Sequence, residues 1–128
     1  MNLLNKIGET ELNTLKKVYQ GNLEDALKLI EEGYPIQYLI GYVDFYNSKI
    51  LVNEHVLIPR FETEYLVEKA IKLLKDKRVT SGIDLCTGSG CIAIALKKNL
   101  NTKIDACDIS DKALELAKEK CRRKPRYQ

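Results

Sequence analysis

Residues 83–96 read IDLCTGSGCIAIAL, so an apolar run enters a turn of small residues and then becomes apolar again. This pattern is typical of a strand that leads through a glycine turn into a helix. We predict a strand over residues 79–86 and a helix over 89–98, then a strand over 103–109 and a helix over 111–120. Alternation at this spacing indicates parallel strands joined by right-handed crossovers, and hence an α/β fold.

The region before this unit has a different pattern. Two short helices are predicted over residues 9–20 and 22–32, with one further helical turn over 35–41. Two β-prone runs then flank Asn47 and Ser48, which predicts a hairpin at these residues.

A longer helix is predicted after the turn at Pro59 and Arg60. Its expected apolar stripe consists of Leu66, Ala70, Ile71 and Leu74. We divide the chain into a helical subdomain (1–41), a hairpin linker (42–60), a partial Rossmann-like α/β domain (61–119) and a basic tail (120–128).

The composition is that of an ordinary globular chain. Of 128 residues, 45% are hydrophobic and 30% are charged, which allows one domain with a modest core. No apolar run approaches the length of a membrane span, and the N-terminus lacks a signal-peptide core. We therefore expect a cytoplasmic protein with no membrane partner.

The cysteines and the only histidine give little sign of a metal site. Cys86, Cys91, Cys107 and Cys121 show no C-x-x-C spacing. We expect the first three to be reduced, packed thiols. His55 has no second histidine as a partner, so we interpret it as a surface or packed residue and expect no metal.

The glycine turn suits a ligand that contains a ribose. Gly88, Gly90 and Ala93 fit the G-x-G-x-x-A pattern, in which glycines let the backbone approach a ligand and free helix N–H groups point at it. Asp108 ends the next strand, 20 residues after Gly88, where an acid can accept hydrogen bonds from both ribose hydroxyls. Dinucleotides and S-adenosylmethionine share these features.

Asp84 favours S-adenosylmethionine. A carboxylate at this turn would repel the pyrophosphate of a dinucleotide, whereas it attracts the ammonium and sulfonium groups of S-adenosylmethionine. Two structural interpretations stay open. Asp84 could be a strand-end acid bonded to backbone amides, and Asp108 could cap the next helix, with Asp111 as a competitor.

Three runs of the sequence resemble the release factor glutamine methyltransferases: HVLIPRFETEYLVE (55–68), GIDLCTGSGCIAIAL (82–96) and DACDISDKALELAKE (105–119). The resemblance implies the first part of a Rossmann-like methyltransferase fold. It also implies methyl transfer from S-adenosylmethionine to the glutamine of the Gly-Gly-Gln loop of peptide chain release factors. The helical subdomain would help to hold the release factor, and no specific nucleic-acid partner is expected.

The resemblance also implies a set of site residues. The expected cofactor-binding residues are Asp84, Cys86, Thr87, Gly88, Ser89, Gly90 and Asp108, and the expected residues at the active-site mouth are Pro59, Arg60 and Thr63. The sequence departs from the family at Phe61, where proline is usual, and at Cys86, where glycine is usual.

The Asn-Pro-Pro-Tyr motif with which the family grips the glutamine amide is absent from residues 1–128, so no catalytic residue is assigned. We expect the chain to be inactive alone. The alternatives are a non-catalytic binding fragment and a fragment of an NAD-dependent oxidoreductase. Two parallel strands would also expose an apolar edge, so we expect a marginally stable, aggregation-prone chain unless a partner covers it.

The tail carries all of the basic excess. Residues 118–128 have a net charge of +5, which against +3 for the whole chain leaves −2 for the rest. With a permitted choice of codons, removing one adenine after Glu119 turns the tail into Asn-Ala-Glu-Glu-Asn-Arg-Val-Ile, a helix end that leads into a further strand. The hypothesis is that residues 120–128 are out of frame.

Reading the gene tests this hypothesis. We expect adenine-rich codons after Glu119 and a homologous reading frame downstream. Codons incompatible with the shift, or no homologous frame, would contradict it. The alternatives are a deliberately shortened chain and a genuine basic tail, which salt-dependent RNA binding lost on deletion of 120–128 would support.

Overall fold

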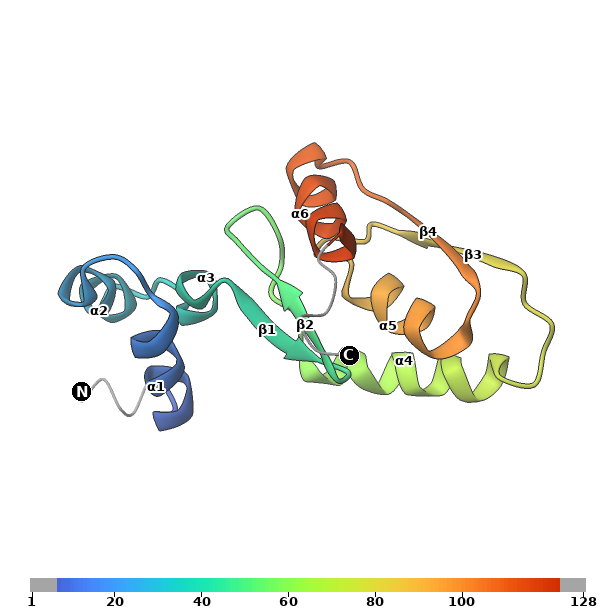
Figure 1. The fold of residues 1–128 in the computed structure, drawn as a ribbon, viewed down its shortest axis with the longest axis horizontal. Coiled ribbons are helices and arrows are strands. Elements are labelled where there is room, and N and C mark those ends of the chain that lie inside the picture. The colour runs from blue at the N-terminus through green and yellow to red at the C-terminus, as the bar shows by residue number, and fades with distance from the viewer. Residues whose placement is uncertain (1–6, 123–128) are drawn as a thin grey trace.

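The computed structural model describes residues 7–122. A helical region leads through a hairpin into an α/β unit (Figure 1). The elements are α1 (Glu9–Val18), α2 (Leu23–Glu31), α3 (Ile36–Ile40), β1 (Tyr42–Phe45), β2 (Ser48–Leu51), α4 (Phe61–Leu74), β3 (Ser81–Leu85), α5 (Cys91–Leu100), β4 (Lys103–Cys107) and α6 (Asp111–Arg122).

The helical region has a small core of its own. Leu15 of α1, Ile30 of α2 and Ile36 of α3 are buried against one another. The Tyr38 hydroxyl donates a hydrogen bond of 2.7 Å to the Val56 carbonyl, beyond the hairpin. This contact connects α3 to the loop that follows β2.

The hairpin is present, but its turn lies one residue before the predicted position. β1 pairs antiparallel with β2, and Ser48 is the first residue of β2, opposite Phe45. The turn consists of Tyr46 and Asn47, whose φ angles of 45° and 62° are those of the two-residue turn that matches strand twist. The backbone N–H of Tyr46 donates to the Glu64 carboxylate, so α4 holds this turn.

The predicted α/β pattern is confirmed. β3 pairs parallel with β4, with Ile83 opposite Asp105 and Leu85 opposite Cys107. The intervening helix α5 packs against both strands, and α4 packs against α5. Phe45 and Ile50 of the hairpin share a buried cluster with these helices, so the hairpin and the α/β unit have a common core.

The predicted apolar stripe of α4 is wrong in one essential position. Val67 is fully buried and lies in the common core, where Ile71 packs against it. Leu66, which was predicted to face inward, is 60% exposed. Periodicity alone favoured Leu66 over its neighbour Val67, because α4 has apolar residues on more than one face.

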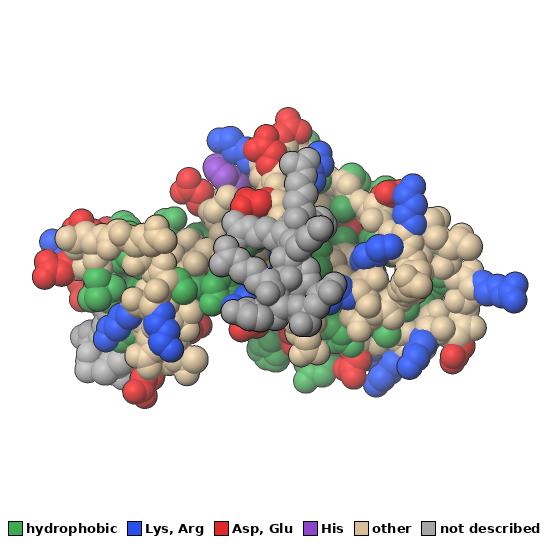
Figure 2. Space-filling model, in the orientation of Figure 1, with side chains coloured by type: hydrophobic (Ala, Val, Ile, Leu, Met, Phe, Trp, Pro, Cys, Tyr) green, Lys and Arg blue, Asp and Glu red, His purple; other side chains and the backbone are tan. Residues whose placement is uncertain are grey.

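One face of the sheet lacks cover, whereas the sequence predicted an exposed apolar edge. Ile83 and Leu85 point to the same face because side chains alternate along a strand, and they are 62% and 66% exposed. Apolar side chains also reach the surface at the N-terminal end of α4, where Phe61 and Tyr65 are exposed (Figure 2).

The predicted tail overlaps the last helix. α6 continues through Lys120 to Arg122, and residues 123–128 lie outside the described range. The division of the chain into subdomains remains a prediction. Among residues 7–122, no helix has both the length and the apolar character needed to cross a bilayer.

Neighbouring residues of α4 should differ sharply in their effect on stability. We expect Val67→Ala to lower the free energy of unfolding by roughly 2 kcal/mol, because it removes buried methyl groups and leaves a cavity. Leu66→Ala should change it by less than about 0.5 kcal/mol. Urea unfolding followed by circular dichroism measures both. An equal loss in the two variants would show that Leu66 also belongs to the core.

Candidate cofactor site at the glycine turn

The turn between β3 and α5 is built from left-handed backbone conformations. Cys86, Gly88 and Gly90 have φ angles of 59°, 57° and 83°, and α5 begins directly after them at Cys91 rather than at residue 89 as predicted. A left-handed conformation costs a residue with a Cβ about 1–2 kcal/mol, so Cys86 is strained at this position.

The two glycines meet different surroundings. A Cβ on Gly90 would lie 3.1 Å from the Ala117 Cβ, so glycine at this position lets α6 approach the turn. A Cβ on Gly88 would meet nothing within 4 Å. The space beside the Gly88 Cα is therefore open.

Asp84 contacts the glycine turn through a hydrogen bond with Thr87. The Thr87 hydroxyl donates a hydrogen bond of 2.7 Å to Asp84 Oδ2, and Asp84 is half-buried. The other carboxylate oxygen, Oδ1, accepts no hydrogen bond from the described residues. The partner of Asp84 is thus a side-chain hydroxyl rather than the backbone amides of the alternative interpretation.

Asp108 joins the two strand-to-helix turns. Its Oδ2 accepts from the Gly88 N–H and its Oδ1 from the Ser110 N–H, both at 2.9 Å. These backbone N–H groups, first that of Ser110, hold the pKa of the Asp108 carboxyl below its usual range. The carboxylate is therefore kept charged beside the glycine turn.

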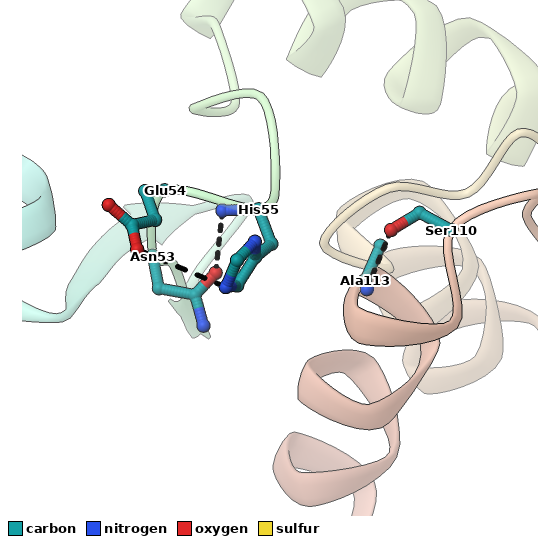
Figure 3. Close-up of polar contacts among 5 residues, drawn as sticks. All are labelled: Asn53, Glu54, His55, Ser110 and Ala113. Atoms are coloured by element: carbon teal, nitrogen blue, oxygen red, sulfur yellow. Dashed lines mark hydrogen bonds and ion pairs between the residues drawn. The ribbon is translucent and has the colours of Figure 1, made fainter.

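Neither Asp108 nor Asp111 caps α6, so the alternative interpretation of Asp108 as a helix cap is wrong. The Ser110 hydroxyl oxygen accepts a hydrogen bond of 3.2 Å from the Ala113 N–H at the start of α6 (Figure 3). Asp111 lies in the first turn of the helix, and Asp108 bonds Gly88 and Ser110 instead. A serine is also a common N-cap, and this position was missed in favour of the two acids.

Sequence reasoning also missed Ile109. Its side chain is fully exposed, directly after Asp108. An exposed isoleucine beside an acid offers an apolar surface on which a nucleobase could pack. An apolar residue directly after the acid that follows a predicted strand is the sequence signal that could have found it.

The predicted mouth residues lie at the start of α4. Arg60 occupies the N-cap position, its side chain is exposed, and its carbonyl accepts from the Thr63 N–H at 3.1 Å. Pro59 and Thr63 are half-buried. Within residues 7–122, no hydrogen bond or ion pair joins these three residues to the glycine turn.

The three cysteines with described side chains, Cys86, Cys91 and Cys107, are free of disulfides, but they are not all packed. Cys91 is buried, and burial raises the pKa of its thiol. Cys86 and Cys107 are exposed, contrary to the prediction, because the sheet face and the turn on which they lie are uncovered. In the described part of the chain, no three His, Cys, Asp or Glu side chains are grouped so that they could hold a metal ion.

His55 lies on the loop after β2. Its backbone N–H donates to Asn53 Oδ1 at 2.9 Å, and its Nε2 lies 4.0 Å from Glu54 Oε1 (Figure 3). It is an exposed loop residue.

Parallel strands, a glycine turn between strand and helix and an acid directly after the second strand are the features of a Rossmann-like α/β unit. Residues 52–128 match the model of the ubiE/COQ5 methyltransferase family. Because the match covers more than half of the chain, the protein belongs to this methyltransferase family. The predicted fold class is confirmed.

Curated relatives agree with the resemblance found in the sequence. The chain is 46% identical over 96 residues to the release factor glutamine methyltransferase of Enterococcus faecalis, covering 74% of this chain and 34% of the relative. It is 47% identical to that of Flavobacterium psychrophilum (75% and 35%) and 50% identical to that of Thermodesulfovibrio yellowstonii (89% and 39%). The chain thus spans about a third of the length of these relatives.

A second family model, that of the pseudin antimicrobial peptides, matches residues 11–32. This segment holds most of α1 and all of α2, and the helix is interrupted between Val18 and Leu23. The short match follows the amphipathic pattern of the two helices and covers only a small part of the chain.

The charge of Asp108 should make stability depend on pH. Its folded-state pKa is lowered, so its contribution is complete above the ordinary aspartate range and is lost as the pH falls through the folded-state pKa. We expect Asp108→Asn to lower the melting temperature at pH 7 and to have a shrinking effect below about pH 4.

Melting followed by circular dichroism between pH 3 and pH 7 measures this effect. Asp105→Asn is a matched control, because Asp105 is an exposed carboxylate on β4 whose ion-pair partner is the exposed Lys103 rather than the backbone of the turns. If the melting temperatures of Asp108→Asn and the unmodified chain differ by the same amount at every pH, the assigned role is contradicted.

Proposed function

We propose that this chain forms the N-terminal and cofactor-binding part of a release factor glutamine methyltransferase. Such an enzyme transfers a methyl group from S-adenosylmethionine to the glutamine amide nitrogen in the Gly-Gly-Gln loop of a peptide chain release factor. The observation that carries the proposal is the pair of carboxylates, Asp84 and Asp108, on either side of an open glycine turn. The names of the curated relatives support the same function.

The residues fit S-adenosylmethionine electrostatically. Asp84 presents a negative charge beside the turn and has an oxygen free of protein donors within residues 7–122. That oxygen suits an ammonium group through a charge-assisted hydrogen bond. A diphosphate at the same place would be repelled, which argues against the NAD-dependent alternative.

The second half of the site suits the nucleoside. Asp108 is fixed by two backbone N–H groups, yet a carboxylate has about four lone-pair positions and so can still accept ribose hydroxyls. Ile109 lies beside it with an exposed apolar side chain for the base. Cys86, Thr87 and the turn backbone would then line the amino acid end of the cofactor.

Residues 1–128 supply only some of the groups that would contact the substrate. Pro59, Arg60 and Thr63 are proposed to lie at the mouth of the site, and α1 to α3 to contact the release factor. An amide nitrogen is a poor nucleophile, so its orientation by hydrogen bonds carries much of the catalysis. Residues 1–128 lack the Asn-Pro-Pro-Tyr motif for this step, so the chain alone should bind the cofactor but catalyse no methyl transfer. We place this activity in the cytoplasm.

Calorimetric titration tests the cofactor assignment. We expect S-adenosylmethionine to bind and NAD to bind much more weakly or not at all. Asp84→Asn, which keeps an oxygen for the Thr87 hydroxyl but removes the charge, should weaken S-adenosylmethionine binding by about tenfold or more, which corresponds to about 1.4 kcal/mol.

Asp44→Asn is the control, because Asp44 is an exposed acid on β1. Equal binding of NAD, or no effect of Asp84→Asn in a chain whose circular dichroism is unchanged, would overturn the assignment. The same samples incubated with release factor and labelled S-adenosylmethionine should transfer no methyl group.

A further inference from the structure

Two exposed thiols lie at the ends of the two parallel strands. Cys107 is the last residue of β4, and Cys86 directly follows β3. Both are free and exposed, whereas Cys91, the third cysteine with a described side chain, is buried. The site assigned above uses Cys86 only as a lining residue and does not use the Cys107 side chain at all.

The strand register brings these two residues together. Leu85 is the partner of Cys107, and the Thr87 N–H donates a hydrogen bond of 2.9 Å to the Cys107 carbonyl. Cys86 lies between Leu85 and Thr87, so its backbone is next to that of Cys107. Adjacent strands lie about 4.8 Å apart, and cysteines joined by a disulfide have Cα atoms about 4.4–6.8 Å apart.

The direction of the side chains is also compatible with a bond. Cys107 shares the uncovered face of the sheet with its partner Leu85. In a regular strand Cys86 would point to the opposite face. Its φ of 59° breaks this alternation at the end of β3, so the Cys86 side chain is not confined to the opposite face.

We propose that Cys86 and Cys107 form a reversible disulfide that closes the cofactor site under oxidising conditions. The bond would join the first residue of the glycine turn to the residue just before Asp108. The turn and the acid would then be held by a covalent link beside the proposed cofactor site. The effect on the cofactor rests on the proposed function, whereas formation of the disulfide does not.

The chemistry balances with hydrogen peroxide as the oxidant. One thiolate attacks a peroxide oxygen, the O–O bond breaks, and a sulfenic acid and one water form. The second thiol then attacks the sulfenic sulfur, so that the S–S bond forms and a second water leaves. Two thiols lose two electrons and two protons in total, and a dithiol reductant reverses the reaction by exchange.

A peptide map of the oxidised chain tests the disulfide itself. The full chain with Cys121→Ser is treated with hydrogen peroxide, digested and analysed by mass spectrometry, with and without dithiothreitol. We expect a cross-linked peptide pair that contains Cys86 and Cys107 and disappears on reduction. Oxidation to sulfinic acid without a cross-link, or a bond to Cys91 instead, would overturn the proposal.

Calorimetry with S-adenosylmethionine tests the switch. We expect oxidation to weaken binding at least tenfold and dithiothreitol to restore it. The Cys107→Ser variant keeps the backbone carbonyl that accepts from Thr87. Its affinity for S-adenosylmethionine before peroxide treatment should equal that of the reduced parent chain, and peroxide should no longer change it. A cross-link that forms without changing the affinity would overturn the regulatory part.

The two proposals fail in different ways. If the reduced chain binds no S-adenosylmethionine, the proposed function fails and the regulatory part fails with it. The peptide map still decides whether the disulfide forms, because that result does not depend on any cofactor.

Discussion

The carboxylate of Asp108 accepts hydrogen bonds from the backbone of both strand-to-helix turns, at Gly88 and at Ser110. Parallel strands bring their carboxyl ends to the same edge of a sheet, so one acid can reach both turns. The bond from the Thr87 N–H to the Cys107 carbonyl reinforces the same edge. The shape of the glycine turn and the start of α6 depend on this group of bonds.

The glycine turn combines openness toward a ligand with close packing behind it. Gly88 leaves the backbone accessible, while Gly90 lets Ala117 of α6 come close. Asp84 and Thr87 place a charge and a hydroxyl beside the turn. The other face of the sheet is uncovered at Ile83 and Leu85, so the surface that bears Cys107 is continuous with apolar side chains. The exposure of Cys107 therefore arises from the sparse cover of the sheet.

Much of the fold could be predicted because its signals are local. The alternation of strand and helix, the hairpin and the glycine turn follow from periodicity and turn chemistry over a few residues. The errors occurred where neighbouring residues fit the same local pattern almost equally well. Val67 rather than Leu66 enters the core of α4, the hairpin turn begins at Tyr46, and Ser110 rather than either neighbouring acid caps α6.

The sequence by itself determined the class of the protein and the residue types at its glycine turn, because a glycine turn between strand and helix and an acid after the next strand can be recognised from local sequence alone. Only the tertiary structure decided which groups those acids bond and which residues stay exposed. Asp108 meets Gly88, and Cys86 lies next to Cys107, only when the strands pair in parallel. Contacts between residues about 20 positions apart depend on register and packing, which no local pattern specifies.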